Sequence, residues 1–411
     1  MQQDGSRPGG PRALWLLPLV ATLAIQTTMS FLARLVPTCA PLFTAATGLA
    51  PESVGVFSGL GTLGSIVVLA IGTPLIRRFG PIRSLQAGLV LAGLGLVLLT
   101  PPTWLAVLAA NILIGIGYGP SAPAGSEVLL RHAPPAHRTL IFSLKQAGVP
   151  VGGVAAGLAL PWLVARMDWR DAVLLLAAVP LLTVLLVQPI RASVDAGRVP
   201  DQPVGLRVLL APSNMMAPLR FALSSPVLRR LMAAGAFFAI GQGALFAFTV
   251  TWLVDSLGYD LATAGFVFAV TQGTGIFGRV ALGWISDRWG SGLRTLRWNA
   301  LAMAATMTGF AFVDQATPLL AVCLLGGLAG ITVSSWNGVH LAEIARHAPA
   351  GRIGEATAGA TLVTFLGYVA GPIGFAVLSA ATGRYDSAFL AVAVAGLAAF
   401  VALAAGRKRP A

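Results

Sequence analysis

The stretch DAVLLLAAVPLLTVLLVQPI at residues 171–190 contains a single charged residue, Asp171, at its first position. Twenty residues in an α-helix extend about 30 Å, which matches the thickness of the hydrocarbon core of a bilayer. Lipid offers no hydrogen-bond partners to backbone groups. An apolar segment of this length is therefore expected to cross the bilayer as a helix, in which the backbone N–H and C=O groups bond to one another. Residues 171–190 therefore predict a transmembrane helix.

Similar segments recur along the whole chain. Of its 411 residues, 56% are hydrophobic and only 10% are charged, whereas a soluble domain carries roughly a quarter charged residues. We predict an all-α membrane protein with twelve transmembrane helices in two pseudo-symmetric six-helix bundles. The predicted spans are 13–36, 53–76, 83–100, 104–128, 139–164, 171–190, 229–256, 261–286, 294–313, 317–345, 353–380 and 386–405.

An internal repeat supports the division into two halves. The tetrapeptide Arg-His-Ala-Pro at 131–134 recurs at 346–349, 215 residues later, and the same offset relates Gly115 to Gly330. Repeats of this kind place a substrate site between the halves, near the middle of the bilayer. The predicted domains are an N-terminal six-helix bundle at 1–190, a cytoplasmic central loop at 191–228 and a C-terminal six-helix bundle at 229–411.

The distribution of charge predicts the topology. The net charge is +13, and with a cytoplasmic N-terminus most arginines outside the spans fall on the cytoplasmic side, as the positive-inside rule requires. The other side receives Arg166, Arg170, Arg384 and, near the end of its span, Arg34. We therefore expect a multi-pass protein of the bacterial inner (cytoplasmic) membrane with both termini cytoplasmic. Its positive charge is expected to meet the lipid bilayer and not nucleic acid.

The two cysteines and the first apolar run argue against a disulfide-bonded protein, a metal-cluster protein and a cleaved signal peptide. Cys39 and Cys323 both lie in or beside apolar segments, which indicates neither a disulfide framework nor a metal cluster. The first run lacks a convincing cleavage site, so we interpret it as a transmembrane helix and not as a signal peptide. The chain also lacks a phosphate-binding glycine loop, a nucleophile–base pair and paired carboxylates. We expect no enzyme activity, no cofactor and no metal.

The sharpest local motif is Gly-Trp-Ile-Ser-Asp-Arg-Trp-Gly at 283–290, which follows the eighth predicted span. It resembles the Gly-x-x-x-Asp-Arg-x-Gly loop signature of the major facilitator superfamily, which occurs after spans two and eight and acts as a conformational latch. The resemblance implies this role for Gly283, Asp287, Arg288 and Gly290. The first-half counterpart at 72–80 lacks the aspartate, so a latch there would have to be weaker or built differently.

Shorter matches point to different subfamilies. Arg279-x-x-x-Gly283 resembles the eighth span of monocarboxylate and oxalate–formate porters, in which an arginine contacts the substrate carboxylate. Lys145-Gln146-x-Gly148 is more similar to cyanate and nitroimidazole permeases, and residues 149–153 loosely resemble an element typical of antiporters. Asn111 stands where many proton-coupled relatives carry an arginine. The subfamily stays open.

Two cations inside the spans are the main candidates for a substrate site. Arg279 lies eight residues before Asp287 and therefore about 12 Å deeper along the helix axis. A guanidinium at that depth costs at least roughly 2.5–3.5 kcal/mol unless it faces water or a partner. In the family architecture spans five and eight meet between the halves, so Lys145 is expected to face the same cavity. The alternatives are a bond from Arg279 to backbone carbonyls and a Lys145 side chain that reaches the cytoplasmic surface.

We find no acidic residue in the middle of a predicted span to neutralise these cations. Two uncompensated cations form a natural anion site, and arginine can hold a carboxylate through two parallel bonds. Weaker candidates for substrate contact are polar or aromatic side chains within the spans, for which hydrogen bonding between helices is the alternative role. These are Arg34, Gln26, Gln242, Gln272, Tyr118, Trp336 and Asn337.

The function that follows is secondary active transport of a small organic anion, with a carboxylate as the first candidate, by alternating access across the inner membrane. Its partners would be the small-molecule substrate and a coupling proton or counter-substrate, and we expect a monomer. The alternative is a drug or metabolite efflux transporter of the same superfamily. A membrane-embedded enzyme or a sensor would require a catalytic cluster or a soluble signalling domain.

Overall fold

The computed structural model describes residues 15–101, 103–134, 138–209, 211, 225–348 and 353–405. Within these ranges the regular elements are helices, as predicted. The N-terminal half comprises α1 (Leu16–Thr47), α2 (Ser53–Ile71), α3 (Thr73–Phe79), α4 (Pro81–Leu98), α5 (Trp104–Tyr118), α6 (Ser121–His132), α7 (Arg138–Val164), α8 (Trp169–Leu176) and α9 (Ala178–Val194).

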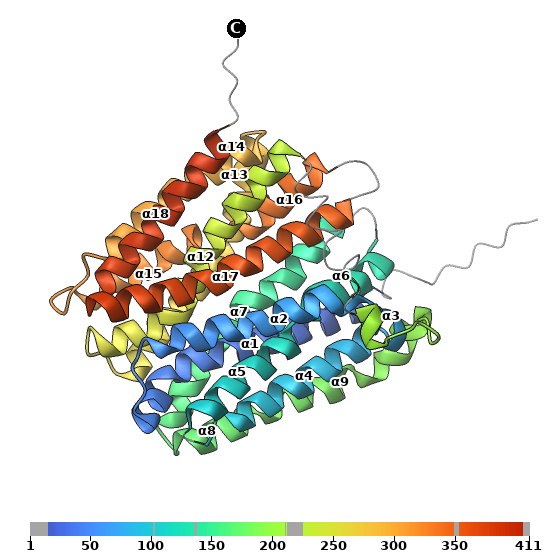
Figure 1. Cartoon of the computed structure of the whole chain (residues 1–411), viewed down its shortest axis with the longest axis horizontal. Coiled ribbons are helices and arrows are strands. Elements are labelled where there is room, and N and C mark those ends of the chain that lie inside the picture. The colour runs from blue at the N-terminus through green and yellow to red at the C-terminus, as the bar shows by residue number, and fades with distance from the viewer. Residues whose placement is uncertain are drawn as a thin grey trace, which may run out of the picture.

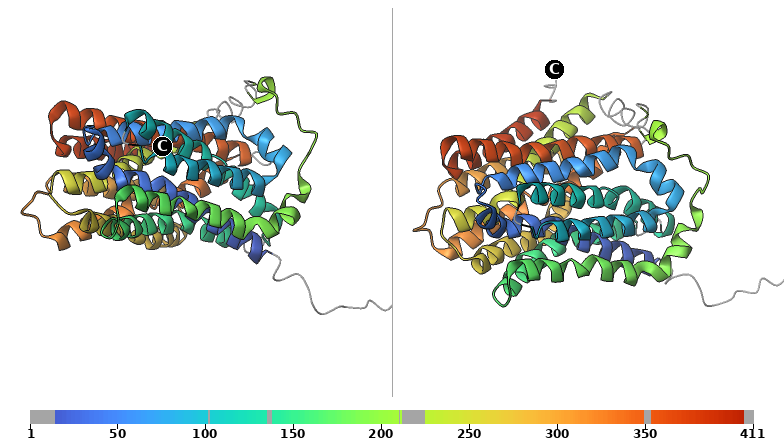
Figure 2. Two further views of the ribbon diagram at one scale, coloured as in Figure 1. Left: turned by 90° about the horizontal axis from the view of Figure 1, so that it is seen from below. Right: turned by 60° about the horizontal axis from the view of Figure 1, so that its bottom comes forward.

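A 3-10 turn, η2 (Asp195–Gly197), and the short helix α10 (Leu206–Leu209) follow α9 and lead toward the second half. In Figure 2 the segment after α9 runs across one end of the bundle. The C-terminal half comprises α12 (Pro226–Asp255), α13 (Leu261–Arg288), α14 (Gly292–Phe310), α15 (Leu319–Thr332), α16 (Asn337–His347), α17 (Ile353–Thr382) and α18 (Tyr385–Ala404).

Four predicted spans each consist of two helices, and the span at 53–76 breaks at Gly72 between α2 and α3. The span at 104–128 breaks between α5 and α6 at Pro120, and the span at 171–190 breaks one turn before Pro180. Proline has no backbone N–H and cannot continue the hydrogen-bond ladder of a helix. The span at 317–345 breaks at 333–336, between α15 and α16. This last break adjoins the candidate site.

Within the described residues, eleven helical segments are long and apolar enough to cross a membrane. Helix α14, which corresponds to the predicted ninth span, is not among them. Arg294 and Arg297 occupy its first two turns and lower its hydropathy. Helix α14 nevertheless packs against α15 and α18 within the C-terminal half.

The two halves lie side by side, with α1–α9 in one and α12–α18 in the other (Figure 1). Across the boundary α7 packs on α13, α2 packs on α17 and α1 packs on α12. Helix α13 begins at Asp260, whose carboxylate accepts a hydrogen bond from the Thr263 amide at 2.7 Å. This bond lowers the pKa of the Asp260 carboxyl.

The halves are in closest contact at one end of the bundle. A Cβ atom on Gly157 of α7 would lie 2.7 Å from the carbonyl oxygen of Gly265 on α13, and one on Gly265 would lie 2.3 Å from that of Gly157. Similarly, a Cβ on Gly55 of α2 would lie 2.3 Å from the carbonyl oxygen of Pro372 on α17. Backbones approach this closely only where the side chains are absent. We call this the sealed end.

The opposite end carries the connections around Arg77, Arg131, Arg288 and Arg346, and we call it the basic end. Gly283 follows Gly265 by eighteen residues, which is five helical turns, so both glycines share one face of α13. A Cβ on Gly283 would meet nothing within 4 Å. At Gly283 this face of α13 is therefore no longer in contact with the other half.

Candidate substrate site between the halves

Arg279 of α13 bridges the boundary between the halves. Its Nη1 donates to the carbonyl of Gln146 on α7 at 3.0 Å, and its Nη2 donates to the carbonyl of Ser334 at 3.4 Å. Ser334 lies in the break between α15 and α16. The buried Nε of Arg279 has no hydrogen-bond partner among the described residues. The Arg279 guanidinium thus hydrogen-bonds to both halves, and its Nε donor has no partner among the described residues.

Arg34 of α1 is the second cation at the boundary. Its guanidinium carbon lies 4.1 Å from the centroid of the Phe246 ring, which belongs to α12 of the other half. Arg34 and Arg279 lie within electrostatic range of each other, where their like charges repel, and both lie near Tyr118 and Tyr368. These four side chains come from α1, α13, α5 and α17, so both halves contribute to one cationic region.

Neither arginine is neutralised within the described part of the chain. The ion pairs found there involve other arginines and His347, and all of them lie toward the helix ends. The Nε of Arg34 is also buried without a hydrogen-bond partner there. A buried donor without a partner costs about 1–3 kcal/mol. An anion at this place would supply both the missing charge and the missing acceptors.

A polar network in the C-terminal half adjoins this region. The Oε1 of Gln242 accepts from the Trp336 indole at 3.0 Å and from the Tyr368 hydroxyl at 2.8 Å. Asn337 donates its amide to the Tyr368 hydroxyl at 3.3 Å, which leaves its Oδ1 buried and unpaired. Trp336 is fully buried and stacks on Phe238 with the ring centroids 5.2 Å apart.

The N-terminal half contributes weaker contacts. Gln26 donates its amide to the hydroxyls of Ser30 and Tyr118, both at 3.4 Å.

Gln272 of α13 faces the boundary from the C-terminal half. Its Nε2 is buried without a described partner. A Cβ on Gly153 of α7 would lie 2.1 Å from that nitrogen, so the absence of a side chain at Gly153 makes room for Gln272 across the boundary.

Lys145 occupies a different position from the two arginines. Its ammonium is buried and donates to the carbonyl of Ser121, at the start of α6, at 3.0 Å. A Cβ on Gly125 would lie 2.9 Å from its Nζ, so Lys145 packs between α6 and α7 within one half. The contacts of Lys145 thus stay within the N-terminal half, whereas Arg279 of the other half reaches α7 at the carbonyl of Gln146.

The latch motif lies at the basic end. Asp287, Arg288 and Gly290 are exposed, and the Arg288 guanidinium lies 5.7 Å from the centroid of the Trp284 ring. Gly290 has a φ of 62°, a conformation that favours glycine. The described contacts of these residues stay within their own half.

A buried aspartate of the linker, Asp195, lies beside the degenerate first-half motif. The buried carboxylate of Asp195 accepts hydrogen bonds from the amides of Ile82 at 2.9 Å and Arg83 at 3.1 Å, in the first turn of α4. The Val199 amide donates to the Arg77 carbonyl at 2.8 Å. The start of the linker is therefore fixed to the turn between α3 and α4.

Comparison with known proteins gives the family. A family model described as Major Facilitator Superfamily matches residues 14–342. The chain belongs to this superfamily. It is therefore a multi-pass membrane transporter and not an enzyme.

Individual relatives within the superfamily are distant. An uncharacterised transporter of this type from Mycobacterium tuberculosis is 27% identical over 83% of this chain and 74% of its own length. The gentisate transporter of Corynebacterium glutamicum is 27% identical over 84% of this chain and 78% of its own. A solved bacterial homologue of the human lysosomal transporter Spinster, inward-facing and unoccupied, has a TM-score of 0.72 at 17% identity, covering 98% of this chain and 100% of that one.

Sequence reasoning missed several residues of the site. The hydroxyl of Tyr368 lies inside the predicted span 353–380, so its polarity was a usable signal. The carbonyls of Gln146 and Ser334 carry no such signal, because every residue has one. Phe246 is one of several aromatic residues in its span, and only the fold places it beneath Arg34.

Proposed function

We propose that this transporter carries a small organic anion with a carboxylate group, bound between Arg34 and Arg279 at the boundary of the halves. The observation that carries the proposal is this pair of arginines, contributed by opposite halves and without an acidic partner in the described residues. The similarity to a transporter of gentisate, an aromatic carboxylate, supports the same chemistry.

The hydrogen bonds of Arg279 suggest how binding is coupled to movement. In the present state its Nη1 donates to Gln146 of the opposite half. A carboxylate brings a compensating negative charge and can accept two parallel hydrogen bonds from the guanidinium, which a single neutral carbonyl cannot. Bound substrate therefore competes with Gln146 for Arg279 and replaces a fixed tie between the halves. Only such a differential interaction can shift a conformational equilibrium.

The direction in which the site opens follows from the charge distribution. In a bacterial inner membrane, the positive-inside rule assigns the basic end to the cytoplasm. The present state is closed at the sealed end and would therefore open to the cytoplasm. Rocking of the halves would then expose the site to the other side. Exchange against a second anion or symport with a proton would drive the cycle.

Lys145 remains a predicted substrate contact. Its ammonium has three donor hydrogens, and one of them is engaged by Ser121. The other predicted contacts, Gln26, Gln242, Gln272, Tyr118, Trp336 and Asn337, would orient the remainder of the substrate.

Uptake by proteoliposomes tests the proposal. We expect purified protein to accumulate a radiolabelled aromatic or aliphatic carboxylate, and Arg279→Ala and Arg34→Ala each to weaken its apparent affinity about tenfold or more. A charge-assisted hydrogen bond contributes about 1.5–3 kcal/mol, and 1.4 kcal/mol corresponds to a factor of ten. Arg294→Ala, an exposed arginine at the basic end, is the matched control.

Two outcomes would contradict the anion site. The first is unchanged carboxylate transport in both the Arg279 and Arg34 variants. The second is transport of lipophilic compounds without any carboxylate, which would favour the exporter. Lys145→Ala in the same assay tests whether the ammonium belongs to the site, because a purely structural Lys145 would leave the substrate affinity unchanged.

A further inference from the structure

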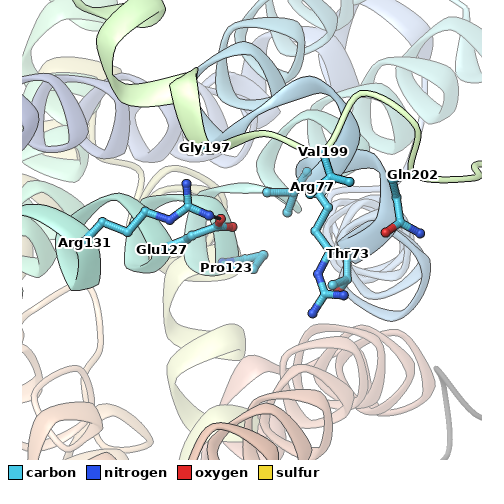
Figure 3. A pocket seen from close by; sticks show the side chains of 9 residues that line it. Thr73, Arg77, Pro123, Glu127, Arg131, Gly197, Val199 and Gln202 are labelled. Atoms are coloured by element: carbon cyan, nitrogen blue, oxygen red, sulfur yellow. Dashed lines mark hydrogen bonds and ion pairs between the residues drawn. The ribbon is translucent and has the colours of Figure 1, made fainter.

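A cavity lies at the basic end of the N-terminal half, and its lining includes neither Arg34 nor Arg279. Its volume is about 380 Å³, within the roughly 300–1,000 Å³ range of small-molecule sites. Arg131 and Glu127 of α6 lie on one side, and Arg77 and Thr73 of α3 lie on the other (Figure 3). The remaining lining residues are Ile76, Pro123, Gly197, Val199 and Gln202.

The charges around this cavity leave a net charge of +1. Arg131 forms an ion pair with Glu127 one turn earlier on α6, which fixes its guanidinium and neutralises one of the two cations. No described residue forms an ion pair or a side-chain hydrogen bond with Arg77. Arg77 is therefore the cation available to a ligand, and the cavity is complementary to a single negative charge.

The linker forms one wall of the cavity and is held in place by several contacts. Asp195 is fixed to the first turn of α4, the Val199 amide donates to the Arg77 carbonyl, and Arg78 donates to the Gln202 carbonyl at 3.2 Å. A Cβ on Gly197 would lie 2.7 Å from a guanidinium nitrogen of Arg131, so this guanidinium packs directly against the linker. The cavity is a built feature between α3, α6 and residues 195–202.

We propose that this cavity binds the phosphodiester of an anionic phospholipid headgroup. A phosphodiester carries one negative charge and two free oxygens, which match the net charge and the forked guanidinium donors of Arg77 and Arg131. Basic pockets at the cytoplasmic end of transmembrane helices bind headgroups of this kind. Arg78 lies on the same helix as Arg77 and adds to the positive potential. A soluble phosphate ester offers similar chemistry, and the experiment separates the two sources.

Thermal unfolding of the purified full-length protein in detergent gives the readout. The probes are dioctanoyl phosphatidylglycerol, glycerol 3-phosphate and inorganic phosphate, each titrated separately. We expect phosphatidylglycerol to raise Tm in a saturable way, with the two soluble phosphates much weaker. Arg77→Gln should weaken the apparent dissociation constant for phosphatidylglycerol about tenfold or more.

Arg83→Gln is the matched control, because it removes one exposed arginine from the same end but outside the cavity. Arg77→Lys keeps the charge and should retain part of the binding, which separates loss of the site from loss of the fold. Equal phosphatidylglycerol affinity in wild type, Arg77→Gln and Arg83→Gln would overturn the site. Binding of glycerol 3-phosphate alone, still dependent on Arg77, would overturn the lipid as the source. None of these readouts involves carboxylate transport, so they are independent of the proposed substrate.

Discussion

Gln242 and Gln26 occupy corresponding places in the first spans of the two halves, but their hydrogen bonds differ. Gln242 accepts from two buried donors at 3.0 and 2.8 Å, whereas both bonds of Gln26 are 3.4 Å long. Gln242→Leu leaves the Trp336 indole and the Tyr368 hydroxyl without their acceptor, at a cost of about 1–3 kcal/mol each. We expect Gln242→Leu to lower Tm clearly more than Gln26→Leu does. Equal Tm values for the two variants would contradict this assignment.

At the residue scale, the sequence singled out buried cations as candidates, but it did not show which of them lie together at the boundary of the halves. An arginine inside an apolar span requires a partner, so Arg279 could be singled out from its position alone. Arg34 appeared less important, because it lies near the end of its predicted span, yet its guanidinium packs on Phe246 of the opposite half. The difference arises from the tertiary packing of α1 against α12, which no local pattern encodes.

Among the elements, the linker after α9 has a structural role that its polar composition did not suggest. Asp195 accepts two amide hydrogen bonds at the start of α4, an arrangement that also favours a negative charge near a helix N-terminus. Asp195→Ala should therefore destabilise the contact by about 0.5–2 kcal/mol, the usual range for a lost helix cap. We expect faster tryptic cleavage after Arg198, and the exposed Asp201→Ala should cleave like wild type. Equal rates for both variants would argue against the contact.

The contact between α7 and α13 at the sealed end depends on two glycines. Gly157→Leu would place a side chain where the Gly265 carbonyl lies, so the helices must separate there. Spin labels at the exposed Ala165 and Ala262 should report a longer distance in this variant than in wild type. The control is Gly374→Leu, because a Cβ at Gly374 meets nothing within 4 Å. An unchanged distance in Gly157→Leu would show that the sealed end does not rely on this contact.

Helix positions were largely predictable from the sequence, because a span needs about twenty apolar residues. The predicted and observed limits of the span at 261–286 differ by two residues at one end. The interruptions were harder to predict, since the break at 333–336 contains no proline and appears only in the fold. That break exposes the Ser334 carbonyl to Arg279, so an unpredicted detail of one element shapes the site.

For the whole molecule, the concentration of arginines at the basic end predicts which end faces the cytoplasm, and this orientation can be tested. In a variant with Cys39 and Cys323 replaced by alanine, a cysteine at Asp201 of the linker should be protected from a membrane-impermeant maleimide in intact cells. A cysteine at Ala316, between α14 and α15, should be labelled without lysis. Labelling of Asp201→Cys alone in intact cells would reverse the orientation derived from the positive-inside rule.

The docking of residues 195–202 has a consequence for how the polypeptide can be divided. Every described contact of this stretch noted above is made with the first half, and α12 begins only at Pro226. A gene split after Gly205 would therefore keep these linker contacts within the first fragment. Two separately synthesised polypeptides, 1–205 and 206–411, should then reassemble in the membrane into a working carrier.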